Sequence, residues 1–265
     1  MAEKYIEVNR NLWNQKTPVH LKSDFYDNES FKAGKTSLNP AELEALGDVN
    51  GKSLLHLQCH FGQDTLSWAR MGATATGIDL SDAAIKAANE LSTEIGVPAR
   101  FIEANVYDTS QHLGDEQFDI VFTSYGCICW LPDLDAWAEI VNRHLKPGGT
   151  FCIVDFHPAY MMYEFDTLEL TYSYFNAGVI IEDADGTYAD RDADLTDQSY
   201  SWNHPFSETL TALLKQGLRL TDFTEYPYSY YNCFPGLEKQ ENGYYMLKGK
   251  ENIMPLMYRF VMEKG

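Results

Sequence analysis

The stretch "SLLHLQCHFGQDT", residues 53–65, begins as a run of apolar residues and then breaks into a turn. A short apolar run bounded by turn signals is typical of a strand that is buried on both faces. The turn keeps one glycine, Gly62, where nucleotide-binding loops usually have several. Three interpretations are open: a cofactor loop whose glycines have been replaced, a metal site made from His56, Cys59 and His60, or an ordinary strand end.

Strands and helices alternate around this stretch as far as about residue 156. Further strands are expected at 73–80, 99–106, 118–126 and 150–158, helices at 65–72, 81–96 and 134–145, and a turn at 146–149. Strands joined by helices of this length imply right-handed crossovers and a parallel sheet that is covered on both faces. The first half of the chain therefore predicts an α/β, doubly wound core.

The second half has a different texture, with short β-like runs rich in tyrosine between residues 159 and 202. These runs lie at 168–175, 178–183, 186–190 and 198–202, with turn signals between them, and we interpret them as β-hairpins laid over the core. A helix is expected at 204–217, and two final strands at 218–229 and 254–265 bring the sheet to seven strands.

The composition of the chain limits the cellular compartment and the binding partners that we expect for the protein. The chain of 265 residues is 45% hydrophobic, and it has five irregularly placed cysteines, no N-terminal apolar run and no long apolar stretch. We therefore expect one large domain in a reducing cytoplasm rather than a secreted or membrane-spanning protein. The 20 Lys and Arg residues face 39 Asp and Glu residues, for a formal net charge of -19. Such a surface repels phosphate backbones and anionic lipid, so neither nucleic acid nor a membrane is an expected partner.

Asp79 carries the strongest single signal for a ligand. It ends the second expected strand, where a carboxylate in an open α/β sheet can accept both hydroxyl protons of a ribose. The alternative is that Asp79 only caps the next helix, a task that Ser81 or Asp82 can perform. The loop lacks G-x-G-x-x-G, and no basic residue closely follows Asp79 to take a 2′-phosphate. This pattern favours a ligand without a pyrophosphate, such as adenosine joined to an amino acid.

Residues 51–155 resemble the core of the class I S-adenosylmethionine-dependent methyltransferases. The first motif of that family is a hydrophobic strand followed by D-x-G-C-G-x-G, and "HLQCHFG" aligns with it, with His56 at the acidic position and Gln58 and His60 at the first two glycines. The stretches "GIDLS", "EANVYD", "FDIVFTSYGCICWLPD" and "LKPGG" resemble the later motifs, in the same order and at similar spacing.

The resemblance implies a Rossmann-like methyltransferase fold, S-adenosylmethionine as the cofactor and a small molecule as the methyl acceptor. It implies a cofactor loop of Gln58, Cys59, His60, Phe61 and Gly62, with Asp79 on the ribose, Leu80 against the adenine, Asn105 and Val106 at the adenine edge, and Ser124 and Tyr125 at the methionine end. Asn105 stands where the family often has an aspartate.

The N-terminal stretch "NRNLWNQKTPVHLKSDFYD", residues 9–27, is similar to the helical lid of many small-molecule members. Trp13 and Tyr26 are its candidate substrate contacts, although both could simply pack against the core. The expected organisation is a single domain over 1–265, comprising an N-terminal lid (1–50), a cofactor-binding core (51–158), a β-hairpin cap insertion (159–204) and a C-terminal completion of the sheet (205–265).

Methyl transfer needs an aligned nucleophile, so positioning and desolvation can supply most of the catalysis without a dedicated side chain. If the acceptor must lose a proton, His157 after the fifth strand is the first candidate base, and Tyr125 is the second candidate catalytic group. The alternative for His157 is that it fixes the turn before Pro158. Aromatic clusters at 160–165, 171–175, 199–202 and 225–234 indicate a cap that could hold an aromatic, apolar or cationic molecule.

Three rival interpretations remain. A zinc site from His56, Cys59, His60, Cys127 and Cys129 lacks a C-x-x-C pair, and strand alternation separates His56 from Cys59, so we expect no metal. A catalytically inactive protein with the methyltransferase fold could bind a partner through its aromatic surface. A nicotinamide oxidoreductase is the third interpretation. The acceptor's identity and the oligomeric state do not follow from the sequence.

Overall fold

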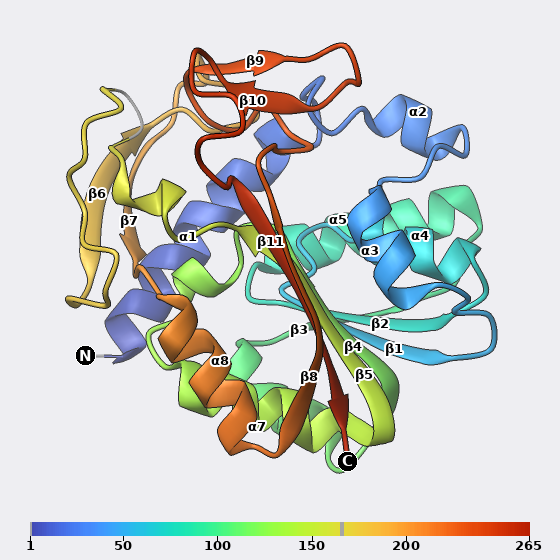
Figure 1. The fold of residues 1–265 in the computed structure, drawn as a ribbon. Helices are drawn as coiled ribbons and strands as arrows, with labels where there is room; N and C mark the ends of the chain where they lie inside the picture. Colours follow the sequence, from blue (N-terminus) through green and yellow to red (C-terminus); the bar gives the residue numbers. More distant parts are fainter. Residues whose placement is uncertain (1, 165–166) are drawn as a thin grey trace.

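A computed structural model of the chain describes residues 2–164 and 167–265. Its centre is a seven-stranded sheet in the order β3-β2-β1-β4-β5-β11-β8 (Figure 1). The strands are β1 (Ser53–Leu57), β2 (Thr74–Asp79), β3 (Arg100–Glu103), β4 (Phe118–Ser124), β5 (Leu145–Phe156), β8 (Leu218–Tyr226) and β11 (Met257–Lys264). The first five strands run parallel, and β11 pairs antiparallel with both β5 and β8. The predicted mostly parallel, doubly wound seven-stranded sheet is confirmed.

Helices cover both faces of this sheet (Figure 1). They are α1 (Ala2–His20), α2 (Asn28–Lys32), α3 (Pro40–Leu46), α4 (Gln63–Arg70), α5 (Asp82–Ile95), α6 (Thr109–Leu113), α7 (Leu134–His144) and α8 (Phe206–Lys215), with 3-10 turns η1 (Val106–Asp108), η2 (Ile128–Trp130) and η3 (Tyr160–Met162). Leu55 of β1 packs with Trp137 of α7 in one apolar cluster, whereas Leu54 packs with Trp68 of α4 in another. Because successive strand residues point to opposite faces, β1 needs apolar residues on both of its faces.

Local sequence signals set the ends of several elements. The Ser81 hydroxyl accepts a hydrogen bond from the Ala84 N–H at 3.0 Å and caps α5, which ends at Gly96 in the left-handed region. The helix predicted over 81–96 is therefore confirmed. The turn expected at 146–149 instead lies within β5, where the pairing with β4 shifts register between Phe118 and Ile120. The glycines there make an irregularity in a longer strand and do not end it.

Helix α1 is joined to the rest of the protein at two places. The Asn9 side chain exchanges two hydrogen bonds with the backbone of Tyr200, at 2.9 and 3.0 Å. Asn14 accepts a hydrogen bond from the Ser81 hydroxyl at 2.6 Å and donates one to Asp82. The N-terminal helix therefore spans from the cap insertion to the helix that follows β2. Across residues 2–164 and 167–265, no helix has the length and apolar character to cross a membrane.

The cap insertion is a single hairpin where several were expected. β6 (Ile180–Asp185) and β7 (Thr196–Ser201) form an antiparallel pair. The strand expected at 168–175 is wrong, since that segment makes only an isolated bridge from Leu170 to Tyr163, and 186–190 is a turn. The aromatic composition of residues 168–175 suits a strand, but no neighbouring strand pairs with the backbone N–H and C=O groups of this segment.

A second hairpin of β9 (Leu237–Lys239) and β10 (Tyr245–Leu247) was not predicted. Phe165 of the aromatic run 160–165 lies outside the described residues.

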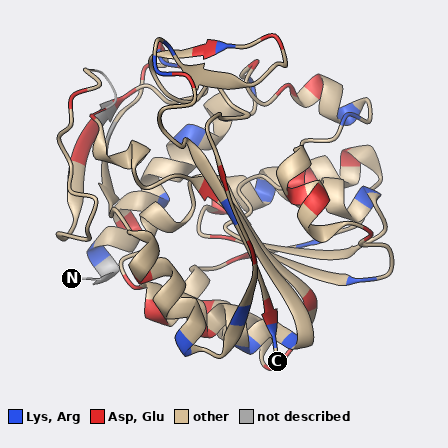
Figure 2. Ribbon diagram, in the orientation of Figure 1, with Lys and Arg blue, Asp and Glu red and all other residues tan. Residues whose placement is uncertain are grey.

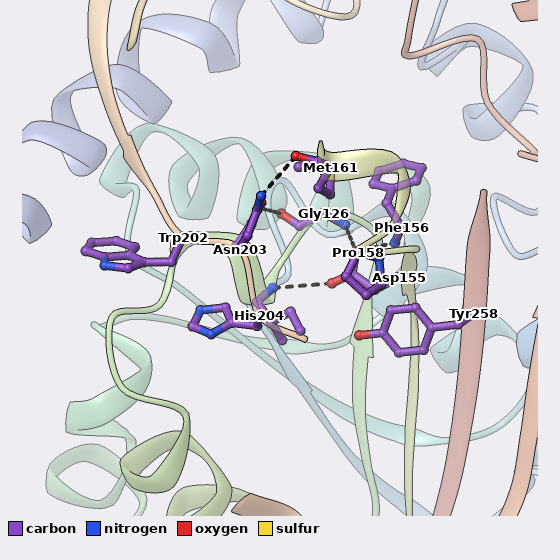
Figure 3. Close-up of a pocket in the computed structure, with 11 residues that line it drawn as sticks. Gly126, Asp155, Phe156, Pro158, Met161, Trp202, Asn203, His204 and Tyr258 are labelled. Carbon is purple, nitrogen blue, oxygen red and sulfur yellow. Dashed lines mark hydrogen bonds between the residues drawn. The ribbon is translucent and has the colours of Figure 1, made fainter. Parts of the chain in front are cut away.

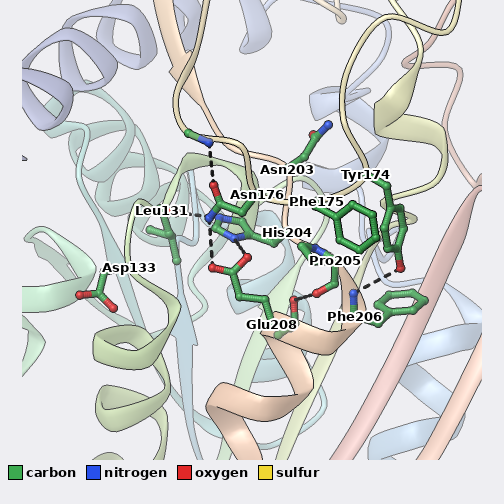
Figure 4. A network of polar contacts seen from close by, with 12 residues as sticks. Leu131, Asp133, Tyr174, Phe175, Asn176, Asn203, His204, Pro205, Phe206 and Glu208 are labelled. Atoms are coloured by element: carbon green, nitrogen blue, oxygen red, sulfur yellow. Dashed lines mark hydrogen bonds and ion pairs between the residues drawn. The ribbon is translucent and has the colours of Figure 1, made fainter.

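A buried histidine ties the cap to the C-terminal part of the sheet (Figure 4). One ring nitrogen of His204, Nε2, donates to the Leu131 carbonyl at 2.8 Å, and the other lies 3.0 Å from the Glu208 carboxylate of α8. Asn176 of the insertion donates to the same carboxylate at 3.0 Å. The start of α8 is thus fixed to both the loop after β4 and the insertion.

Two glycines with the same backbone requirement allow a matched stability test. Gly62 and Gly96 have φ of 82° and 66°, but a Cβ would lie 2.6 Å from the Phe101 ring at Gly62 and within 4 Å of nothing at Gly96. We expect Gly96→Ala to lower the free energy of unfolding by about 1 kcal/mol through backbone strain alone. Gly62→Ala adds a clash in a packed region and should cost about 1 to 3 kcal/mol more. Urea denaturation of both variants measures the difference, and equal losses would contradict the close approach of Phe101 to the loop.

Candidate active site

The loop after β1 keeps a glycine-type backbone although two of its glycine positions carry side chains. Gln58 and His60 have φ of 58° and 49°, in the left-handed region that favours glycine. A left-handed backbone costs a residue with a Cβ about 1 to 2 kcal/mol. The loop is held by a hydrogen bond from the Cys59 N–H to the Ile78 carbonyl at 2.9 Å. The chain therefore tolerates strain to keep this loop shape at the carboxyl ends of β1 and β2.

Asp79 links this loop to the helix after β2. Its carboxylate accepts the His60 N–H at 2.7 Å with one oxygen and the Ser81 N–H at 2.9 Å with the other. Burial raises the pKa of Asp79 to about 6, and these backbone hydrogen bonds act against the rise. Because the Ser81 hydroxyl caps α5, Asp79 is not needed for that task. Each carboxylate oxygen also keeps a further lone pair for a ligand hydroxyl.

Two buried polar atoms of the site lack a partner. Gln58 donates from Nε2 to the Cys127 carbonyl at 2.9 Å, but its Oε1 accepts no hydrogen bond. The Nδ1 atom of His20 lies 3.0 Å from Nε2 of His60, whereas Nε2 of His20 is unpaired. A buried polar group without a hydrogen bond costs about 1 to 3 kcal/mol. A ligand with complementary polar groups would remove this cost, which makes the loop a plausible cofactor cradle.

The predicted adenine-side residues lie next to this loop. Leu80 is half-buried and follows Asp79 directly. The Ala104 N–H donates to the Asp79 carbonyl at 2.9 Å, which brings the end of β3 alongside, and Val106 is buried there. The Asn105 side-chain oxygen accepts the Tyr107 N–H at 3.2 Å and so caps η1. Cys59 and Phe61 are buried beneath the loop, where Phe61 contacts the Tyr26 ring at 4.7 Å.

Tyrosines from four separate segments meet above the carboxyl ends of the strands. Tyr26 comes from the lid, Tyr125 follows β4, Tyr188 lies in the cap, and Tyr231 follows β8. The Tyr26 and Tyr188 hydroxyls are 2.5 Å apart, and the Tyr125 and Tyr231 ring centroids are 4.9 Å apart. Burial is the largest cause of the raised pKa of all four, yet each side chain is only half-buried. Phe25 contacts both pairs, with its ring centroid 5.3 Å from that of Tyr188 and 5.6 Å from that of Tyr231, so we infer that the four tyrosines border one common space.

Two acids lie beside these tyrosines, one fully buried and one half-buried, and the sequence did not point to either. Glu42 of α3 is 0% exposed and accepts the Tyr125 hydroxyl at 2.7 Å and the Asn39 N–H at 2.7 Å. Burial, with a contribution from the Asp64 charge, raises the pKa of Glu42 to about 8. Asp64 in the first turn of α4 accepts the hydroxyls of Ser37 at 2.6 Å and Ser124 at 2.9 Å, and burial raises its pKa as well.

Ser124 also joins the buried His56 to this network. His56 lies 3.2 Å from the Ser124 hydroxyl through Nε2 and 2.9 Å from the Thr65 hydroxyl through Nδ1. Burial lowers the pKa of His56 to about 3, so the ring is neutral at physiological pH. Within the two described ranges, no group of three or more His, Cys, Asp or Glu residues is arranged to hold a metal ion. His56 therefore acts as a hydrogen-bonding link beneath the loop.

Helix α1, in the segment that the sequence predicts to be a lid, adds aromatic rings and a basic group next to the loop. The Trp13 ring contacts His60 at 5.3 Å and Trp130 at 5.4 Å, centroid to centroid. Lys16, one turn along α1, is 8% exposed, and its ammonium lies 5.4 Å from the Trp13 ring. Its charge helps to lower the pKa of both His20 and His60, which places it within electrostatic reach of the loop. A lysine three positions after an inward-facing tryptophan is the signal that could have identified it.

His157 does not join this group. Its Nδ1 accepts the Ala159 N–H at 3.0 Å, and its Nε2 donates to Glu225 at 2.8 Å on the edge strand β8. The ring packs edge-on against Phe206, 4.7 Å away between centroids. The first of these hydrogen bonds is the turn-fixing arrangement that was the alternative to catalysis. Both nitrogens are occupied by the protein, so neither presents a free lone pair to the tyrosine-lined space.

Asp155 fixes the loop that carries Tyr125. Its carboxylate accepts backbone N–H groups of Gly126, Cys127, Ile128 and Phe156. A pocket with about 360 Å³ of free space, part of it open to solvent, lies beside this carboxylate and reaches Asn203 and Tyr258 (Figure 3). Tyr125 itself has a φ of 44°, so the loop after β4 is strained, and the hydrogen bonds to Asp155 hold it in this conformation.

The sheet order, with β11 antiparallel between β5 and β8, and the loop closed by Asp79 define a class I methyltransferase fold. Residues 55–151 match the methyltransferase domain family. The solved structure of an S-adenosylmethionine-dependent methyltransferase from Mesorhizobium loti superposes with a TM-score of 0.58 at 17% identity, over 88% of this chain and 100% of that one. One from Methanosarcina mazei gives 0.57 at 19% identity, over 86% and 98%. Residues 55–151 therefore match the methyltransferase domain family, and the solved structures show that the chain shares the fold of class I S-adenosylmethionine-dependent methyltransferases, as the motif order predicts.

Curated relatives cover the same region. An uncharacterized methyltransferase of Synechocystis is 35% identical over 126 residues, which are 47% of this chain and 56% of the relative. A ubiquinone biosynthesis O-methyltransferase of Pseudomonas syringae pv. tomato is 29% identical over 128 residues, 47% of this chain and 54% of the relative. The chain thus spans about half the length of these relatives.

The raised pKa of Glu42 predicts a specific pH dependence of stability. The folded state holds the proton up to about pH 8, whereas the unfolded chain releases it near the ordinary glutamate pKa of 4.5. The native state therefore binds the extra proton between these values, and wild-type stability should fall as the pH rises through that window, by at most about 1.4 kcal/mol per pH unit. Glu42→Gln removes this cost, so its free energy of unfolding should gain on wild type from pH 5 to pH 8 in urea denaturation.

Glu44→Gln is the control for this measurement, because it removes an exposed carboxylate from the same helix, and it should follow wild type across the range. If the difference in free energy of unfolding between Glu42→Gln and wild type did not change with pH, the conclusion that Glu42 is protonated in the folded state would be wrong.

Proposed function

We propose that this protein is an S-adenosylmethionine-dependent methyltransferase that acts on a small molecule. The observation that carries the proposal is the strained loop of Gln58 and His60, which is locked to the Asp79 carboxylate at the end of β2. A protein that used this edge of the sheet only for packing would have no reason to keep two side chains in glycine-type conformations. The family match and the shared fold support the same activity.

Each part of the cofactor has a complementary partner in the site. We assign the ribose hydroxyls to Asp79, the adenine to the space between Leu80 and Val106 with Asn105 at its edge, and the methionine end to Gln58, Ser124 and Lys16. The unpaired Gln58 Oε1 is an acceptor for the methionine ammonium group. Lys16 is a buried cation that suits the methionine carboxylate. The bound cofactor would supply an electrophilic methyl group on a sulfonium.

The enclosed setting supports a small acceptor. The lid and the cap meet over the site through the paired hydroxyls of Tyr26 and Tyr188, and Trp13 closes the side next to His60. Exclusion of water strengthens electrostatic interactions inside a site and prevents side reactions. A large acceptor would have to displace these contacts, whereas a small molecule can be held inside them. This geometry also supports Trp13 and Tyr26 as residues near the acceptor.

Tyr125 is the side chain best placed to orient the acceptor. It follows β4 directly, and its hydroxyl already donates to Glu42 at 2.7 Å. A tyrosine that is fixed by a buried carboxyl can position an acceptor for in-line transfer. To act as a base, His157 would first have to leave its bonds to Ala159 and Glu225.

Calorimetry with S-adenosylhomocysteine tests the proposal. Wild-type protein should bind it, and Asp79→Ala should weaken binding about tenfold to a hundredfold because hydrogen bonds to a charged group are lost. Asp115→Ala removes a carboxylate whose side chain is 94% exposed and should bind like wild type. A wild-type protein that bound neither S-adenosylhomocysteine nor S-adenosylmethionine would instead be the catalytically inactive binding protein considered above.

A further inference from the structure

We propose that the methyl acceptor is a small organic amine, held as a cation between the tyrosine rings and the Asp64 carboxylate; this rests on the proposed function. The tyrosine rings are those of Tyr26, Tyr125, Tyr188 and Tyr231. Asp64 adjoins the same space, because its carboxylate accepts the hydroxyl of Ser124 at 2.9 Å and Ser124 directly precedes Tyr125 in the chain. Its charge also contributes to the raised pKa of Tyr125.

The acids of this space have no protein cation of their own. In residues 2–164 and 167–265, none of the ion pairs involves Asp64 or Glu42. Asp64 is half-buried and accepts the hydroxyls of Ser37 and Ser124. Charges withdrawn from water are normally paired, because desolvation is costly. Asp64 is therefore a partly desolvated charge to which a ligand can bring a cation.

A second observation points to a hydrogen-bond donor in the ligand. His20 is 0% exposed, and its ring lies 4.8 Å from Tyr188 and 5.3 Å from Tyr26, centroid to centroid. Its Nε2 has no partner. Burial lowers the pKa of His20 to about 2 and that of His60 to about 3, so both rings are neutral. When Nδ1 of His20 carries the proton toward His60, the free Nε2 is an acceptor for an ammonium N–H.

The tyrosines offer ring faces rather than hydroxyls. The hydroxyls of Tyr26 and Tyr188 bond to each other, that of Tyr125 bonds to Glu42, and that of Tyr231 accepts from Asn39 at 2.8 Å. Each of the four hydroxyls thus has a partner within the protein, whereas the electron-rich ring faces are available to a ligand. Aromatic faces next to a carboxylate are the usual recognition elements for organic ammonium groups.

The charge of the chain agrees with a cationic ligand. Asp and Glu outnumber Lys and Arg by 39 to 20, and acidic residues lie on elements all around the ribbon (Figure 2). An excess of one sign raises the local concentration of ligands of the opposite sign. An anionic acceptor, such as a carboxylate or phenolate, would be repelled by the surface and by Asp64.

The same arrangement suits the transfer itself. The bound ammonium first gives one proton to the Asp64 carboxylate, whose raised pKa makes it a better base than an exposed aspartate. The freed nitrogen lone pair then forms the N–C bond while the sulfur–methyl bond breaks, and that electron pair stays on sulfur. The product is an N-methylated ammonium and S-adenosylhomocysteine, so the positive charge passes from sulfur to a nitrogen that lies among the same rings.

The first test measures binding of a minimal probe to wild-type protein saturated with S-adenosylhomocysteine. Tetramethylammonium should raise the unfolding temperature, whereas tert-butanol, which is similar in shape and uncharged, should not. Asp64→Asn and Tyr231→Leu should each weaken the probe about tenfold, while Tyr231→Phe keeps the ring and should retain binding. Asp115→Asn, at an exposed ion pair with Arg143, serves as the control and should match wild type.

The second test measures S-adenosylhomocysteine release with matched sets of small amines, alcohols and carboxylates of the same skeleton. Release should be confined to the amines. Equal effects of tetramethylammonium and tert-butanol, or release with carboxylates or alcohols but not with amines, would overturn the inference. Calorimetry of wild-type protein with S-adenosylhomocysteine distinguishes failure of this inference from failure of the proposed function. If the protein binds S-adenosylhomocysteine but does not discriminate the cation from the alcohol, the inference fails and the methyltransferase assignment stands. If the protein does not bind S-adenosylhomocysteine, the assignment itself fails.

Discussion

The hydrogen bonds that the Asp79 carboxylate accepts from His60 and Ser81 are the constraint on which the rest of the site depends. One side chain at the end of β2 fixes the loop after β1 and the start of α5 at the same time. Ser81 also accepts the cap of α5 and donates to Asn14 of the lid, so the carboxylate positions the lid through one intermediate residue. Because burial opposes its charge, Asp79 needs these backbone donors to remain ionised, and the loop needs the carboxylate to stay in a strained conformation.

The two side chains that stand at glycine positions of this loop make contacts of their own. In a loop with glycine at all positions, the ligand would contact backbone alone. Here Gln58 reaches across to the Cys127 carbonyl, and His60 pairs with His20 of the lid. The side chains therefore connect the loop after β1 to the loop after β4 and to α1, while Oε1 of Gln58 and Nε2 of His20 have no partner among the described residues. The strain of a left-handed Gln58 and His60 is compensated by contacts that glycine could not make.

The sequence was sufficient for the fold because periodicity and turn chemistry are local. The apolar run at 53–57, the cap at Ser81 and the stop at Gly96 each act within a few residues, and the structure confirms all three. The segment 168–175 failed because aromatic composition predicts a strand only when a partner strand is present, and that depends on distant residues. A related reason explains why the sequence did not reveal Glu42, Asp64, Lys16 and His20. Their burial arises where lid, loop and cap meet, which no local pattern reveals.

The acids Glu42 and Asp64 show how the site can hold one net charge with two carboxyls. Desolvation raises the proton affinity of both, and the Asp64 charge raises that of Glu42 further, so simultaneous ionisation is unfavourable. Glu42, with its pKa near 8, keeps the proton at neutral pH, while two hydroxyl donors stabilise the charge on Asp64. The Tyr125 hydroxyl bridges the neutral acid and the enclosed space. A single anion next to ring faces matches a monovalent cation. Two anions would require a dication. With no anion, only dispersion and cation–π attraction would hold the ligand. The protonation of Glu42 is therefore what sets the charge of the ligand that this space can accept.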